Sequence, residues 1–256
     1  MTWETLDEAY DRLRATGPEF DGWLSNHGPM AAEVLVRHGH GDAVGSWVDG
    51  YARRLEPAPR ATGRVDDWRG ALGDARRLGD WLEHFEEELR EGSWTDVLTT
   101  WWPRLLPGIA AGATHGVIRV GHAVRVLREQ GEAPARVAEL AQGLGYWAAR
   151  WQRVPGAVAP DGSLVAQAAV AGLPRVPSQE GGITARLAQL GETTGWPDAQ
   201  RALAPASDAE AFLREVVVAA VGRFATHAHG NPVMLVHAAT APNAVLRVLP
   251  SLPREL

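Results

Sequence analysis

Apolar residues recur along the chain at three- and four-residue intervals, which is the spacing of one buried face of an α-helix. The first such stretch covers residues 3–16, where the apolar positions are Leu6, Ala9, Tyr10 and Leu13. Gly17 and Pro18 follow it, and both residue types end helices. A second clear stretch covers residues 73–92, with Leu78, Leu82, Phe85 and Leu89 on one side.

The same pattern, with Ser, Asn, Asp, Pro and Gly at the expected ends, predicts further helices. They cover residues 29–38, 42–55, 93–113, 113–127, 133–152, 183–190, 207–225 and 232–249. Asn231 and Pro232 are expected to start the last of these, and Pro242 to interrupt it. No stretch alternates with the period of two that marks strands. The sequence therefore predicts an all-α fold, a single-domain helical bundle over residues 1–256 with several helices interrupted by Pro or Gly. Within this domain we expect the weakest connection at the Gly-, Pro- and Ala-rich loop 153–182.

The composition narrows the possible functions. The net charge is -6 and no basic block occurs, which argues against nucleic acid as a partner. Cysteine is absent, which excludes disulfides and thiolate chemistry, so any metal must have nitrogen or oxygen ligands. Lysine is absent too, since all 25 basic residues are arginine. The N-terminus has no signal-peptide core, and the apolar runs look too short or too broken to span a bilayer. We therefore expect a cytoplasmic protein with no membrane partner.

Histidines in apolar or cap positions are the main chemical signal. His115, Arg119 and His122 share one stripe of the apolar segment 113–127, where unpartnered polar groups would be costly to bury. His237 lies among apolar residues, with Thr240 one turn on as a possible partner for its ring. His27 lies where a loop meets a helix start.

Two readings of these histidines remain open at this point. Each alone is more simply explained by an internal hydrogen-bond network, but together they suggest imidazoles that converge from several helices on one metal ion. His227 and His229 precede the last helix, and one of them could point inward. Nitrogen donors without sulfur suit Fe, Mn, Zn or Cu, and no HExxH motif chooses among these metals.

His38, His40 and His84 are expected at the surface. The segment "GLGYWA" matches GxGxxA formally but follows a helix, so it is weak support for dinucleotide binding.

Three segments give the chain a resemblance to the questin oxidase-like family: "LSNHGPMAAEVL", "THGVIRVGHAVRVL" and "HGNPVMLVHAATAPNAVLRVLPSLP". The family includes fungal oxidases that open an anthraquinone ring. The resemblance implies an all-helical fold, O2 as co-substrate and a non-haem iron held mainly by histidines. It places ligands at His27, His115 and His237, with a fourth at His227 or His229 and His122 close by. The family site is understood to include a modified lysine, which this chain lacks. Glu33 is a possible substitute.

The resulting expectation is an Fe(II)-dependent oxygenase, with another divalent metal as an option, that cleaves the ring of a small aromatic polyketide. Arg119 and His122 are the candidate catalytic residues beside the metal, although Arg119 could equally anchor a structural network. One alternative is a non-catalytic accessory protein that binds an apolar ligand in a biosynthetic pathway. A weaker alternative is a hydrolase or lyase that uses zinc-activated water.

Overall fold

The computed structural model describes residues 3–230 and 232–255, so Asn231, the expected start of the last helix, lies outside the described residues. Over these ranges the chain forms thirteen α-helices and one antiparallel pair of two-residue strands, which confirms the all-α prediction. The elements in chain order are α1 (Glu4–Arg14), β1 (Glu19–Phe20), β2 (Leu24–Ser25), α2 (Gly28–Arg37), α3 (Gly41–Ala52), α4 (Trp68–Ala71), α5 (Leu78–Glu91), α6 (Trp94–Leu105), α7 (His115–Gln130), α8 (Pro134–Ala149), α9 (Ala166–Ala171), α10 (Ile183–Ala188), α11 (Trp196–Arg201), α12 (Ala209–His227) and α13 (Pro232–Val248).

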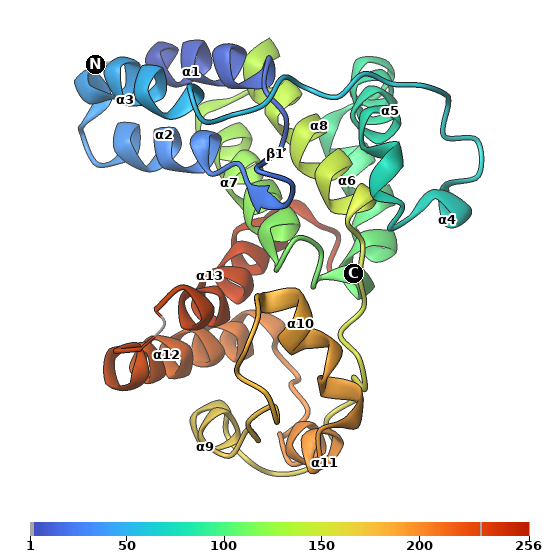
Figure 1. The fold of residues 1–256 in the computed structure, drawn as a ribbon, viewed down its shortest axis with the longest axis vertical. Helices are drawn as coiled ribbons and strands as arrows, with labels where there is room; N and C mark the ends of the chain where they lie inside the picture. The colour runs from blue at the N-terminus through green and yellow to red at the C-terminus, as the bar shows by residue number, and fades with distance from the viewer. Residues whose placement is uncertain (1–2, 231, 256) are drawn as a thin grey trace.

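The helices gather into two parts (Figure 1). Residues 3–152, here called the large lobe, carry α1 to α8. Residues 153–230, the small lobe, carry α9 to α12. Helix α13 packs against α12 of the small lobe and α7 of the large lobe, and so joins the two. The segment 153–182, expected as a loop, contains only the short α9 and leads from one lobe into the other.

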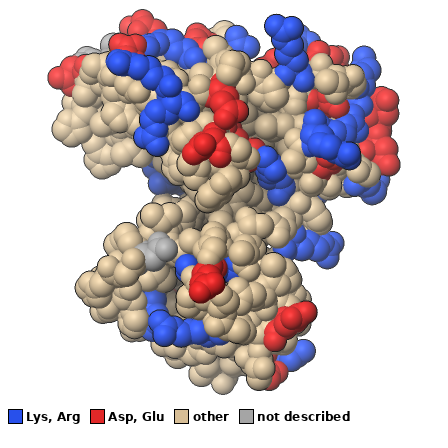
Figure 2. Space-filling model, in the orientation of Figure 1, with Lys and Arg blue, Asp and Glu red and all other residues tan. Residues whose placement is uncertain are grey.

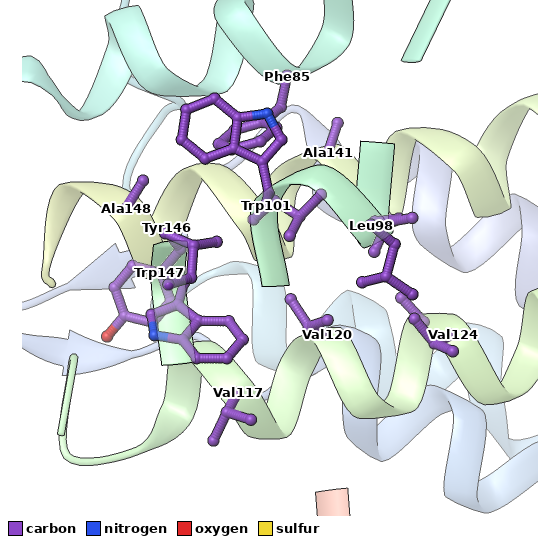
Figure 3. Close-up of a cluster of buried hydrophobic side chains, with 14 of the residues drawn as sticks. Phe85, Leu98, Trp101, Val117, Val120, Val124, Ala141, Tyr146, Trp147 and Ala148 are labelled. Carbon is purple, nitrogen blue, oxygen red and sulfur yellow. The ribbon is translucent and has the colours of Figure 1, made fainter. Parts of the chain in front are cut away.

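Large buried side chains are concentrated in the large lobe. Its main core contains four tryptophans that are almost completely buried, Trp81, Trp101, Trp102 and Trp147, packed with valines of α7 (Figure 3). The predicted apolar faces of α1 and α5 are both confirmed as buried. The small lobe buries mainly alanines, and Val218 and Val221 of α12 are more than half exposed. Most charged side chains on the face seen in Figure 2 lie on the large lobe.

Helix α13 differs from the expectation in two ways. Pro242 lies inside the helix without ending it. Its ring displaces the hydrogen bond to the carbonyl of Ala238, and because Ala238 is exposed, losing that bond costs less than it would in a buried turn. The stretch Pro232–Ser251 is also long and apolar enough, by length and composition, to cross a membrane, so the expectation that no stretch meets this criterion was wrong. Only 22% of that window is buried, and a single helix of this kind is weak evidence for a membrane span.

Helices α7 and α13 touch at Gly121. A Cβ atom added there would lie 2.8 Å from both Cα and Cβ of Ala244. Gly121→Ala should therefore force the two helices apart and lower the free energy of unfolding by roughly 1–3 kcal/mol. The matched control is Gly222→Ala in α12, where nothing lies within 4 Å, and which should leave stability unchanged or raise it by up to about 1 kcal/mol. Urea unfolding followed by circular dichroism measures both, and equal effects of the two variants would contradict this packing account.

Candidate metal centre

Three imidazole rings from distant parts of the chain lie side by side, and the His115 ring contacts the other two. His27 immediately precedes α2, His115 is the first residue of α7, and His237 lies in the second turn of α13. The Nε2 atom of His115 is 2.9 Å from Nε2 of His27 and 3.2 Å from Nε2 of His237. Two of the rings thus come from the large lobe and the third from the helix that joins the lobes.

Backbone carbonyls fix the tautomer of all three rings. Nδ1 of His27 lies 2.7 Å from the Ser25 carbonyl oxygen, Nδ1 of His115 lies 2.6 Å from that of Gly112, and Nδ1 of His237 lies 2.6 Å from that of Val233. A carbonyl only accepts, so each Nδ1 carries the proton and donates it. In the neutral rings each Nε2 therefore presents a lone pair towards the neighbouring rings.

The rings of His27 and His115 are poorly suited to hold a proton at neutral pH. Burial lowers the pKa of His115 to about 4, and the neighbouring His27 contributes to that shift. Burial also lowers the pKa of His27, which outweighs the hydrogen bond to Ser25. Nε2 lone pairs this close repel one another unless a proton or a metal ion lies between them, so a bound cation would stabilise the arrangement. Neutral imidazole nitrogens are ligands for Fe, Zn, Cu and Ni, and this donor set fits such an ion.

The rings lie closer together than the ligands of a bound ion. Two nitrogens on a tetrahedral metal with bonds near 2.1 Å are about 3.4 Å apart. Among the described residues, no group of three or more His, Asp or Glu side chains lies in an arrangement that could hold a metal ion as it stands. A tetrahedral metal ion would therefore have to move these rings apart by a few tenths of an ångström. Metal binding by the three histidines stays a prediction.

The backbone before His115 is strained. Gly112, Ala113 and Thr114 all have positive φ, at 53°, 56° and 72°. Such values cost little for glycine but roughly 1 kcal/mol or more for each of the other two residues. This left-handed turn brings the Gly112 carbonyl back to the His115 ring. Strain of this kind persists only where the surroundings fix it, and it is common at functional sites.

The segment that carries His27 is held by its neighbours. The Asn26 side chain donates to the Gly17 carbonyl and accepts from the backbone N–H of Gly28. The His27 N–H donates to the Tyr51 hydroxyl at 2.9 Å. On α13, Thr240 does not hold the His237 ring as expected, because its hydroxyl donates to the Val236 carbonyl and the ring uses Val233, one turn earlier.

The remaining candidate ligands lie elsewhere. His227 and His229 are exposed near the end of α12, where His227 pairs with Thr226, and neither lines the cavity beside the three rings. His122 shares a stripe with His115 as expected, but seven helical residues separate them by about 10 Å along α7. It instead hydrogen-bonds Glu33 at 2.9 Å. His122, expected close to the metal ligands, and Glu33, considered as a substitute for the lysine, therefore bind each other.

Glu33 is the centre of a buried charge cluster. Its side chain is fully buried and is bound by His122, Arg37 and Arg125. Burial by itself raises the pKa of this carboxyl, but the hydrogen bonds from His122 and Arg37 and the charge of Arg125 outweigh it and lower the pKa to about 2. Glu33 is thus ionised and fully engaged where α2 and α7 meet.

Arg119 has a buried partner as well. Its guanidinium binds the Glu139 carboxylate with two hydrogen bonds of 2.6 and 2.8 Å, and both side chains are less than 5% exposed. Burial opposes its charge, but the Glu139 carboxylate keeps the pKa of Arg119 above its ordinary value. Arg119 does not line the cavity, and the geometry matches the structural network considered for it.

A cavity of about 330 Å³ opens beside the three histidines. Its polar lining residues are Glu19, Ser25, Arg150, Gln152 and Thr184. Its apolar lining residues include Trp23, Leu24, Ile183, Leu187, Val233 and Met234. Arg150 Nε donates to Glu19 at 3.0 Å, so these two opposite charges face the cavity as a pair. Both lobes and α13 contribute to the wall.

The Glu33 cluster predicts a pH dependence of stability. A carboxyl whose pKa falls from 4.5 to about 2 on folding stabilises the protein above pH 4.5, by about 3 kcal/mol, and this contribution is lost as the pH falls towards 2. Glu33→Gln should therefore lose several kcal/mol at pH 7 and show a shallower decline between pH 5 and pH 2. Urea unfolding at several pH values tests this. The control is Glu129→Gln at the surface end of the cluster, which should cost less than about 1 kcal/mol. Parallel pH curves for wild type and Glu33→Gln would contradict the account.

Comparison with known proteins places the chain in a family. The model of the questin oxidase-like family matches residues 38–178, which is 141 of 256 residues or more than half of the chain. The matched range includes His115 and stops short of His27 and His237. No curated protein and no solved structure matches the chain. The family name supports an oxidoreductase at a coarse level. The chain belongs to the questin oxidase-like family.

Proposed function

We propose that this protein is a non-haem iron-dependent oxygenase that oxidatively cleaves a ring of an aromatic polyketide. The observation that carries the proposal is the meeting of three Nε2 atoms, from His27, His115 and His237, at the wall of a cavity. Membership of a family named for an oxidase agrees with redox chemistry at such a point.

The donor set admits iron among several metals, and the family name, that of an oxidase, favours a redox-active one. Ferrous iron held by imidazole nitrogens with open coordination positions binds and activates O2. Among the described residues, the only carboxylate that lines the cavity is Glu19, and Arg150 binds it. Three imidazoles without a free carboxylate would leave coordination positions for O2 or substrate. The absence of lysine removes the modified ligand that the family resemblance implies.

The chain itself would orient the metal and the substrate. The carbonyls of Ser25, Gly112 and Val233 keep each Nδ1 protonated and so keep each Nε2 available as a ligand. The apolar lining residues would exclude water and pack against a flat aromatic ring. Gln152 and Thr184, among the polar lining residues, offer hydrogen bonds to phenol or carbonyl oxygens, while the Glu19–Arg150 pair would add a dipole there.

Metal binding by matched histidine variants is the first test. Anaerobic titration with Fe(II) in a calorimeter should give one tight site in the wild type and none in His115→Ala. The control variants His227→Ala and His229→Ala should bind as the wild type does, because both residues lie away from the three rings. Circular dichroism of each variant confirms that it is folded. A wild-type protein with no affinity for Fe(II) would end the proposal in favour of the non-catalytic accessory protein.

Oxygen consumption separates the oxygenase from a metal-dependent hydrolase. Iron-loaded protein with a hydroxylated anthraquinone should consume O2 in an electrode cell and yield a ring-opened product by mass spectrometry. His237→Ala should lose this activity and keep its helical content. Turnover without O2 uptake, supported equally well by zinc, would favour the hydrolase.

A further inference from the structure

The segment Gly143–Ala148 of α8, which matches a dinucleotide-binding pattern only formally, has a packing role beside the histidines. A Cβ atom on Gly143 would lie 3.1 Å from the Val120 side chain of α7, and one on Gly145 would lie 3.0 Å from Cα of Leu82 in α5. These close approaches fix the rotation of α8 between α5 and α7. As a result, the adjacent Tyr146 and Trp147 lie at the end of the core where α7 begins (Figure 3).

The Tyr146 hydroxyl touches both segments that support the large-lobe histidines. It lies 2.6 Å from the Ser25 hydroxyl. It also lies against Gly112, where an added Cβ atom would be only 2.3 Å from it. Ser25 provides the carbonyl that accepts from His27, and Gly112 provides the carbonyl that accepts from His115. One buried hydroxyl therefore contacts the residues that set the directions of two rings.

We propose that Tyr146 is a positioning residue that holds the Ser25 and Gly112 carbonyls in place and thereby aims the Nε2 atoms of His27 and His115 at the same metal ion. The inference rests on the metal site of the proposed function. It assigns Tyr146 no contact with metal or substrate: the side chain acts only through the two carbonyls.

The turn before His115 explains why such a support is needed. Ala113 and Thr114 hold strained positive φ values, and a strained turn relaxes unless its surroundings fix it. Tyr146 packs on one end of the turn at Gly112. Trp147 packs on the other end, because a Cβ atom on Gly116 would lie 2.8 Å from the Trp147 Cβ, and its Nε1 donates to the Gly108 carbonyl at 3.1 Å. Burial raises the pKa of the Tyr146 phenol, so the neutral hydroxyl persists at any working pH and acts by hydrogen bonding alone.

Two variants remove the same hydrogen bond from opposite sides. Tyr146→Phe deletes one hydroxyl and keeps the ring, and Ser25→Ala deletes the other and keeps the carbonyl that binds His27. The control is Tyr10→Phe, which removes a hydroxyl that is equally buried but has no hydrogen-bond partner among the described residues. Co(II) serves as the probe, because its visible absorption reports affinity and ligand geometry. The melting temperature of the metal-free protein reports any purely structural effect.

We expect Tyr146→Phe and Ser25→Ala each to weaken Co(II) binding about 10-fold and to change the Co(II) spectrum. The double variant should bind no worse than Tyr146→Phe, since that variant already lacks the hydrogen bond that Ser25→Ala removes. Tyr10→Phe should bind Co(II) as the wild type does. If Tyr146→Phe does not fold, Ser25→Ala together with the control carries the test.

The outcomes separate this inference from the proposed function. Wild-type affinity and spectrum in Tyr146→Phe or Ser25→Ala would overturn the positioning role and leave the metal site intact. A loss of affinity that only follows a lower melting temperature of the metal-free protein, with an unchanged spectrum, would overturn it as well. A wild-type protein that binds no Co(II) would remove the proposed function itself.

Discussion

The close contact between imidazole nitrogens from three distant segments governs the geometry of the site. Each ring donates its Nδ1 proton to a backbone carbonyl, and the Nε2 atom of His115 lies 2.9 Å from that of His27 and 3.2 Å from that of His237. Such an arrangement is costly unless a cation lies near it. The fold maintains it with groups that have no role in ligation, among them the strained turn before His115 and the Asn26 network around His27. The backbone is thus organised around a position that favours positive charge.

The three rings also link the two parts of the molecule. His27 and His115 belong to the large lobe, whose tryptophan core is densely packed, while His237 belongs to α13, which also packs on the small lobe. The buried Glu33 cluster lies further along α2 and α7, and the Arg119–Glu139 pair ties α7 to α8. These ion pairs hold the framework while the cavity wall is completed by residues 182–187 of the less densely packed small lobe. A ligand in the cavity would therefore contact both lobes.

The sequence predicted those features that depend on local spacing. Apolar spacing predicted the buried faces of α1 and α5. Apolar spacing, cap positions and family resemblance together selected His27, His115 and His237, and the structure brings these three rings together. The prediction that His122 lies beside the metal ligands did not match the structure. A shared helical stripe gives the direction of two side chains but not the distance between them, and His122 lies two turns beyond His115, where it binds Glu33. The structure does not bring His227 or His229 to the three rings. The direction of these two side chains depends on how the chain turns between α12 and α13, which local spacing does not predict. The roles of Ser25, Gly112 and Tyr146 were not visible in the sequence, because each depends on contacts between segments that are distant along the chain.

Anomalous X-ray diffraction from crystals grown with Fe(II) under anaerobic conditions would show whether the three histidines bind one metal ion. We expect one strong iron peak about 2.1 Å from the Nε2 atoms of His27, His115 and His237, with the three rings spread slightly and every Nδ1 still bound to its carbonyl. An iron peak elsewhere in the molecule, or the three rings unchanged beside an empty position, would contradict it.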